Sequence, residues 1–243
     1  MKRRGFLTTM AGVGALASLA IAQNKRIDTA ADASKQTASR PEWLKLTPPA
    51  SGKIPVAFLL SEGATIIDFC GPWEVFQDVS VKGDAGAFSL YTVAETLEPI
   101  TASAGMRITP SFTYENAPTP KVVVIPAQRT RSEATLNWLK KVSETSDVVM
   151  SVCTGAFLLA ATGLLNGKKA TTHHDFFDRF AQKYPQVELK RGLRFVENQK
   201  FSSAGGLTSG IDLALRVVER YFGREVAERT AFYMEYQSKS WMV

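Results

Sequence analysis

The stretch 148–156 constrains the fold more than any other part of this sequence. Mostly apolar and β-branched residues stop abruptly at Cys153, Thr154 and Gly155, and residues 156–161 then have almost no polar face. This pattern predicts a buried strand, a tight turn and a buried helix. A cysteine at such a turn lies near a helix N-terminus, where unpaired N–H groups and the helix dipole favour an anion and lower the pKa of a thiol.

Repeated units of strand, loop and helix surround this stretch, and they predict an α/β fold with a mostly parallel sheet between two layers of helices. The expected strands are 54–60, 88–94, 121–125, 148–152, 169–172, 187–197 and 200–203, with a hairpin outside the main sheet at 100–108. The expected helices are one that has Pro72 in its first turn and runs to about Val79, one over 132–142 with Ser132 as N-cap, 156–161, 175–184, and 211–222. In such a sheet, functional groups gather beyond the carboxyl ends of the strands.

The N-terminus predicts export. Arg3 and Arg4 precede an apolar run of small residues that ends at Ala22, which resembles a cleavable twin-arginine signal and places the protein in a bacterial periplasm. The alternative is an uncleaved anchor, although the run is shorter than the roughly 20 residues that a membrane span needs. The predicted organisation is a signal peptide over residues 1–22, a flexible linker over 23–52 and one domain over 53–243.

Composition narrows the function classes. The formal net charge is +6 and falls to +3 once the three basic residues of the signal are removed, and no basic run with interleaved aromatics is present, so nucleic-acid binding receives little support. The C-terminal segment leaves little room for a helix-turn-helix. Two cysteines, Cys70 and Cys153, allow at most one disulfide, and together with only two histidines they predict no metal cluster.

Three groups that can do chemistry fall at predicted strand ends. Cys153 with Thr154 is either a nucleophile with its neighbour or a buried core thiol. Asp68 stands among apolar residues, where a carboxylate is costly to bury unless paired or protonated, so it is a candidate acid or else a helix cap. His173 is a candidate partner for Cys153, and His174 is equally a solvated residue at a helix start.

Four residues are accessory candidates: Gly71, His173, Gly155 and Cys70. Cys70 is either structural or a disulfide partner for Cys153. The pair at 205–206 is most simply the turn between the last strand and its helix, since no phosphate-binding glycine motif is matched.

Four motifs occur in order along the chain: Asp68-Phe-Cys-Gly-Pro-Trp-Glu-Val-Phe, Ser151-Val-Cys-Thr-Gly-Ala, Gly163-Leu-Leu-Asn-Gly-Lys-Lys-Ala-Thr-Thr-His, and Ala204-Gly-Gly-Leu-Thr-Ser-Gly-Ile-Asp-Leu-Ala-Leu. With these motifs the domain resembles the ThiJ/PfpI superfamily, which has the class I glutamine-amidotransferase-like fold. Within it, the chain is most similar to isonitrile hydratases and to amidase-like domains that precede AraC-type DNA-binding domains. The resemblance implies a homodimeric, flavodoxin-like three-layer sandwich with the cysteine on a nucleophile elbow.

The resemblance also implies a reaction. In isonitrile hydratases the functional residues match Cys153, Asp68 and Thr154 of this chain, and the expected activity is hydration of a small isonitrile to an N-substituted formamide, with no metal or organic cofactor. Two alternatives remain open. One is another thiol reaction of the superfamily, glyoxal hydration or amide hydrolysis, and the other is a non-catalytic periplasmic protein that binds a ligand or senses redox state through Cys153.

Overall fold

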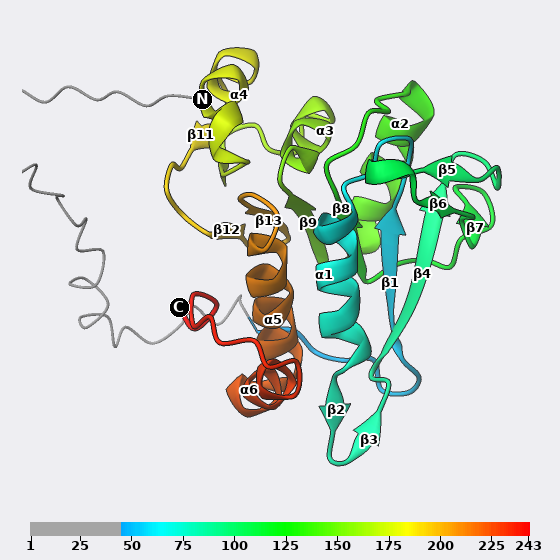
Figure 1. The fold of residues 1–243 in the computed structure, drawn as a ribbon, viewed down its shortest axis with the longest axis vertical. Coiled ribbons are helices and arrows are strands. Elements are labelled where there is room, and N and C mark those ends of the chain that lie inside the picture. The colour runs from blue at the N-terminus through cyan, green and yellow to red at the C-terminus, as the bar shows by residue number, and fades with distance from the viewer. Residues whose placement is uncertain (1–44) are drawn as a thin grey trace, which may run out of the picture. The chain divides into compact units, whose positions relative to one another are not determined.

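A computed structural model describes residues 45–243, and the predicted signal peptide (1–22) and the first part of the predicted linker (23–44) lie outside the described residues. Within the described chain, seven strands form one sheet that is parallel except for β12, which pairs antiparallel with β13. In spatial order the strands are β12 (Phe195–Asn198), β13 (Phe201–Ala204), β9 (Val148–Val152), β8 (Val122–Ile125), β1 (Ile54–Leu59), β4 (Phe88–Ala94) and β7 (Phe112–Thr113) (Figure 1).

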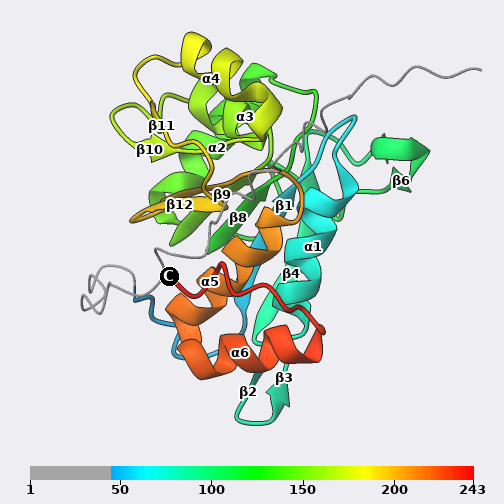
Figure 2. The same cartoon turned by 60° about the vertical axis from the view of Figure 1, so that its left-hand side comes forward.

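Alternating side chains of the central strands build two separate cores. Val56 and Phe58 of β1 face one core, and Ala57 and Leu59 face the other. Because both faces are apolar, each needs a covering layer of helices. One face is covered by α1 (Ile66–Gln77), α5 (Ser209–Phe222) and α6 (Arg224–Tyr233), and the other by α2 (Glu133–Thr145), α3 (Gly155–Ala161) and α4 (Phe177–Lys183) (Figures 1 and 2). The predicted three-layer α/β fold is confirmed.

Short elements decorate the main sheet. The described chain has three two-stranded ladders: β2 (Ser80–Val81) with β3 (Asp84–Ala85), β5 (Ile100–Thr101) with β6 (Arg107–Ile108), and β10 (Lys169–Ala170) with β11 (Glu188–Leu189). Residues 45–243 also contain the 3₁₀ turns η2 (Ser103–Gly105) and η3 (His174–Phe176). The hairpin that the sequence places outside the main sheet at 100–108 is therefore present as β5 and β6.

The prediction for the first helix was wrong about where it begins. Pro72 lies inside α1 rather than in its first turn, because the helix already starts at Ile66. Contacts from other loops satisfy the first amides: Thr65 N–H donates to the Ala127 carbonyl at 2.9 Å, and Ile66 N–H donates to Ser103 Oγ at 3.1 Å. The missing N–H of Pro72 removes the amide that would pair with the carbonyl of Asp68, one turn earlier.

The second helix of the sequence begins as expected. Ser132 is the N-cap of α2, and its Oγ accepts a hydrogen bond from Thr135 N–H at 3.1 Å.

At the start of the described chain, Leu46 N–H donates to the Arg220 carbonyl at 2.8 Å. Among the helices of residues 45–243, none combines the length and hydropathy that crossing a bilayer requires.

Candidate active site

Cys153 occupies a strained turn between β9 and α3. Its φ angle is +58°, in the left-handed region that non-glycine residues rarely adopt. Strong contacts hold it there: Cys153 N–H donates to the Gly205 carbonyl at 2.8 Å, and its carbonyl accepts from Thr172 Oγ1 at 2.9 Å. Such strain persists only where surrounding contacts over-determine it, and it occurs preferentially at functional sites.

The glycine after the turn is required by a close approach of main chains. A Cβ added to Gly155 would lie 2.1 Å from the Ile125 carbonyl oxygen at the end of β8. The first turn of α3 therefore rests directly on the neighbouring strand. This contact, rather than a chemical role, explains the accessory candidate Gly155, and it fixes Cys153 relative to the carboxyl end of β8.

Asp68 reaches the same point from the opposite helical layer. It is the third residue of α1, is completely buried, and accepts a hydrogen bond through Oδ2 from Ala127 N–H at 3.0 Å. The carboxyl group also interacts with the Cys153 thiol, which lowers the pKa of Asp68. Oδ1 has no hydrogen-bond partner among the described residues, and a buried oxygen without a donor disfavours the ionised carboxylate.

Burial shapes the protonation of the pair. Burial raises the pKa of Asp68 to about 7, although the hydrogen bonds from Ala127 and Cys153 lower it. Burial also raises the pKa of the Cys153 thiol to about 11, and the negative charge of Asp68 adds to that rise. The sequence-based expectation of a lowered thiol pKa was wrong, because desolvation and the adjacent carboxylate outweigh the helix N-terminus. Around pH 8 the pair consequently holds one proton, on sulfur.

Two backbone amides act on the sulfur atom. The N–H groups of Thr154 and Leu207 both lower the pKa of the Cys153 thiol. Thr154 was expected from the sequence, since it directly follows the cysteine and is the N-cap of α3. Leu207 was missed, and its φ of +52° marks a second strained residue that no side-chain pattern indicates.

The loop that carries Leu207 is braced from outside. Gly205 N–H donates to the Arg194 carbonyl at 2.9 Å, and the Arg194 guanidinium reaches Thr208 Oγ1 at 3.3 Å. Arg194 is held in turn by Asp212 of α5, with Nε 2.7 Å from Oδ2. We call residues 205–208 the donor loop.

The histidines do not pair with the thiol. In the described chain, His173 makes no hydrogen bond with Cys153, and its Nδ1 instead accepts from Asp175 N–H at 3.3 Å. The His173 ring packs beneath the donor loop, where a Cβ on Gly206 would lie 2.5 Å from its Cδ2. His174 is exposed. Of these three side chains, the carboxyl group of Asp68, and neither imidazole, interacts with the Cys153 thiol.

The two remaining accessory candidates lie along α1. Cys70 is half-buried, and neither it nor Cys153 forms a disulfide in the structure. Burial raises the pKa of the Cys70 thiol, and the charge of Glu74 adds to the effect. Gly71 lies where α1 crosses α5, and a Cβ there would be 2.9 Å from Ile211 Cγ1. Gly71 thus permits the helix contact that brings Asp68 toward the sheet.

The protein thus combines a three-layer α/β fold with a cysteine on a strained nucleophile elbow. The elbow lies at the carboxyl edge of the mostly parallel sheet and faces a buried carboxyl group. The model of the DJ-1/PfpI family matches residues 55–220, so the chain belongs to the DJ-1/PfpI family.

Relatives within the family differ in what they do. The chain is 30% identical to an isonitrile hydratase from Pseudomonas putida over 186 residues, which cover 74% of this chain and 78% of that protein. It is 28% identical to the HTH-type transcriptional regulator CdhR from Pseudomonas aeruginosa over 174 residues, 70% of this chain and 51% of the regulator. The chain therefore spans about half the length of that regulator.

Solved structures agree with the fold. A ThiJ/PfpI family protein from Pseudomonas syringae superposes with a TM-score of 0.69 at 25% sequence identity, covering 85% of this chain and 84% of that one. Drosophila melanogaster DJ-1beta superposes with a TM-score of 0.66 at 15% identity, over 77% of this chain and all of that chain. The latter likeness concerns the fold alone.

Proposed function

We propose that the protein is a cysteine-dependent hydratase that converts a small isonitrile and water to an N-substituted formamide. The observation that carries the proposal is the buried pair of Asp68 and Cys153 with no histidine bonded to the thiol. Similarity to the isonitrile hydratase of Pseudomonas putida supports the same reaction.

The first half of the proposed reaction uses the proton shared by the pair. The Asp68 carboxylate takes the thiol proton as sulfur bonds to the terminal carbon of the isonitrile, and the carboxylic acid then delivers that proton to the same carbon. The product is a thioimidate, R–N=CH–S, on Cys153. A pKa near 7 suits a group that must act as base and then as acid.

Water completes the reaction. Asp68, again a carboxylate, accepts one proton from a water molecule whose oxygen bonds to the thioimidate carbon, and then passes that proton to the nitrogen. Collapse of this intermediate forms the formamide carbonyl, breaks the C–S bond, and returns the remaining proton to sulfur. The N–H groups of Thr154 and Leu207, which lower the pKa of the thiol, stabilise the thiolate that leaves.

The direct test is an assay of purified protein with cyclohexyl isonitrile, with formation of the formamide followed by chromatography. Cys153→Ala is expected to abolish turnover, and formamide production that persists in this variant would rule out the mechanism. The rate constant kcat/KM is expected to rise with pH through about 7, because the first step needs the Asp68 carboxylate.

The alternative functions receive less support from the geometry. Amide hydrolysis would be favoured by an imidazole bonded to Cys153, whereas His173 bonds to Asp175 N–H instead. Redox sensing needs a readily formed thiolate, whereas burial and Asp68 raise the pKa of the Cys153 thiol to about 11.

We further propose that the enzyme works as a homodimer in the periplasm after twin-arginine export. The basis is the Arg3-Arg4 head with its apolar run and the family resemblance. Replacing both arginines by lysine is expected to retain the protein in the cytoplasmic fraction, and equal periplasmic yield would contradict the export route. Light scattering of the purified protein tests the dimer.

A further inference from the structure

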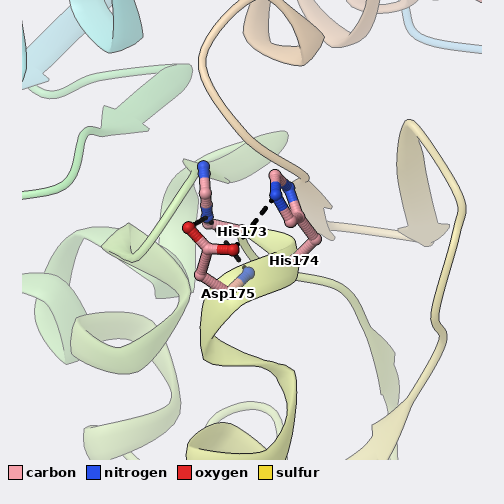
Figure 3. Close-up of side chains that lie close together, drawn as sticks. All are labelled: His173, His174 and Asp175. Carbon is pink, nitrogen blue, oxygen red and sulfur yellow. Dashed lines mark hydrogen bonds and ion pairs between the residues drawn. The ribbon is translucent and has the colours of Figure 1, made fainter.

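Both histidines of this chain are adjacent in the sequence. The sequence has two histidines in 243 residues, His173 and His174, next to each other at the start of η3. Their rings stack with centroids 4.3 Å apart and planes 25° apart. The Asp175 carboxylate contacts both rings, with Oδ1 3.1 Å from His174 Nε2 and Oδ2 3.7 Å from His173 Nδ1 (Figure 3). No step of the hydration proposed above uses these groups.

We propose that His173, His174 and Asp175 form a binding site for a divalent transition-metal ion of the Zn²⁺ type. One ligand atom from each residue lies within 4.8 Å of the other two. Ligands of a tetrahedral zinc ion are about 3.3 Å apart, since each bond is roughly 2.0–2.1 Å long. The two nitrogen-to-oxygen separations, 3.1 Å from His174 to Oδ1 and 3.7 Å from His173 to the other carboxylate oxygen, lie on either side of that value.

The chemistry of the donors selects the metal. Two imidazole nitrogens and one carboxylate oxygen suit zinc, copper, nickel and cobalt ions. Magnesium and calcium prefer sets made of oxygen alone. The site is therefore expected to discriminate Zn²⁺ from Mg²⁺ strongly.

One ligand is held in place before metal arrives. The His173 side chain is 17% exposed and is packed between Phe176 and Gly206. The side chains of His174 and Asp175 are 73% and 67% exposed, so an ion can enter from solvent. Binding then needs to fix the conformation of only these two side chains. The bond from Asp175 N–H to His173 Nδ1 is long, at 3.3 Å, and coordination at Nδ1 replaces it.

The site has room for further ligands of the metal. Both imidazoles line an open hollow of about 390 Å³, which Leu207 and Thr208 of the donor loop also line. Three protein donors leave a coordination position for water, as in open zinc sites.

The test is calorimetric titration of Zn²⁺ into the untagged full chain carrying Cys153→Ala, which removes a thiol able to bind zinc. The expected result is one ion per chain with a dissociation constant on the order of 10 µM. His174→Ala and Asp175→Asn, both at exposed positions, are each expected to weaken binding at least tenfold. The matched control is Asp178→Asn, an exposed carboxylate one turn further on that pairs with Arg191, and it should leave the affinity unchanged.

Imidazole NMR gives a second readout, because two rings account for every histidine signal of the chain. Both ring systems are expected to shift with Zn²⁺, and neither with Mg²⁺. The proposal is overturned if 1 mM Zn²⁺ produces no binding, if binding leaves both rings unshifted, or if His174→Ala and Asp175→Asn bind as tightly as the parent chain.

Discussion

Asp68 and Asp212 are two buried carboxyl groups in matching positions with opposite surroundings. Each lies in the first turn of a helix, α1 or α5, and each is completely buried. The two helices pack against each other on the same face of the sheet. Position and burial therefore do not distinguish them.

Their partners do. Asp212 bonds to the Arg194 guanidinium through Oδ2 and accepts from Ser238 Oγ through Oδ1 at 2.9 Å. Asp68 has one backbone N–H and the neutral thiol of Cys153, and no cation within the described chain pairs with it. A buried charge with a cationic partner remains ionised, whereas one without it takes up a proton near neutrality. Asp212 consequently braces the donor loop through Arg194, and Asp68 is available for proton transfer.

The largest expected effect is on turnover. Asp68→Asn keeps the shape of the side chain and the bond from Ala127 N–H but cannot move a proton, so kcat/KM for isonitrile hydration should fall about a thousandfold. Formamide production measures the loss, and Glu74→Gln, at an exposed carboxylate on the same helix, is the control. A drop of less than tenfold in Asp68→Asn would remove Asp68 from the mechanism.

The second prediction tries to convert Asp212 into a second Asp68. Arg194→Met removes the cation and leaves a buried carboxylate, which should lower the free energy of unfolding at pH 8 by about 3 kcal/mol. This loss is at the lower end of the range expected when one partner of a buried ion pair is removed, because the Arg194 side chain is 39% exposed. Urea denaturation measures the change.

Removing the unpaired charge as well should reduce that loss, so the double variant Arg194→Met/Asp212→Asn is expected to be more stable than Arg194→Met alone. The control is Asp212→Asn, which removes the charge at every pH and should cost less at pH 8. Equal losses in Arg194→Met and in the double variant would show that lost packing, rather than an unpaired charge, destabilises Arg194→Met.

The third prediction applies linkage to Asp68. Its pKa is raised from 3.8 to about 7 by burial, so the folded protein binds a proton that the unfolded chain releases between these values. Stability from this group is full below about pH 4 and is lost as pH rises through 7. Asp68→Asn lacks this loss and should be about 4 kcal/mol more stable than the parent at pH 8, with little difference at pH 4.

Thermal or urea unfolding across this pH range checks the sign. A variant that is less stable at pH 8 than the parent would mean that the folded protein stabilises the Asp68 carboxylate, so that burial does not raise its pKa. A gain in stability together with lost turnover would instead identify Asp68 as a destabilising group whose presence is explained by catalysis.

Much of this contrast could be predicted from the sequence. Apolar runs gave the central strands, and the break at Cys153 gave the elbow, because burial and turns follow residue type. Asp68 was conspicuous since a carboxylate among isoleucines and phenylalanine is costly unless it is paired or protonated. From the sequence alone, both residues could be assigned to the same edge of a parallel sheet.

The rest depended on groups that carry no residue identity. Ala127 and Leu207 contribute backbone N–H groups, which every residue but proline has. The early start of α1 depended on Ser103 from a distant loop. The rise in the thiol pKa depended on the depth of burial, which is a property of the packed fold. The pairing of Asp212 with Arg194 could not be predicted from the sequence because the two residues are 18 positions apart.

The smallest effect tests how Asp68 acts on its neighbour. At pH 8 a thiol of pKa about 11 is roughly 0.1% thiolate, so Cys153 should alkylate slowly with iodoacetamide. Asp68→Asn removes one of the two main causes of the raised pKa, and the rate at Cys153 should rise about fivefold. Mass spectrometry follows both cysteines in the same sample. Cys70 is the internal reference, because the charge that raises its pKa is that of Glu74, and its rate should not change. If Cys153 also keeps its rate, burial alone suppresses the thiolate, and Asp68 serves as a proton carrier without setting the charge of the sulfur.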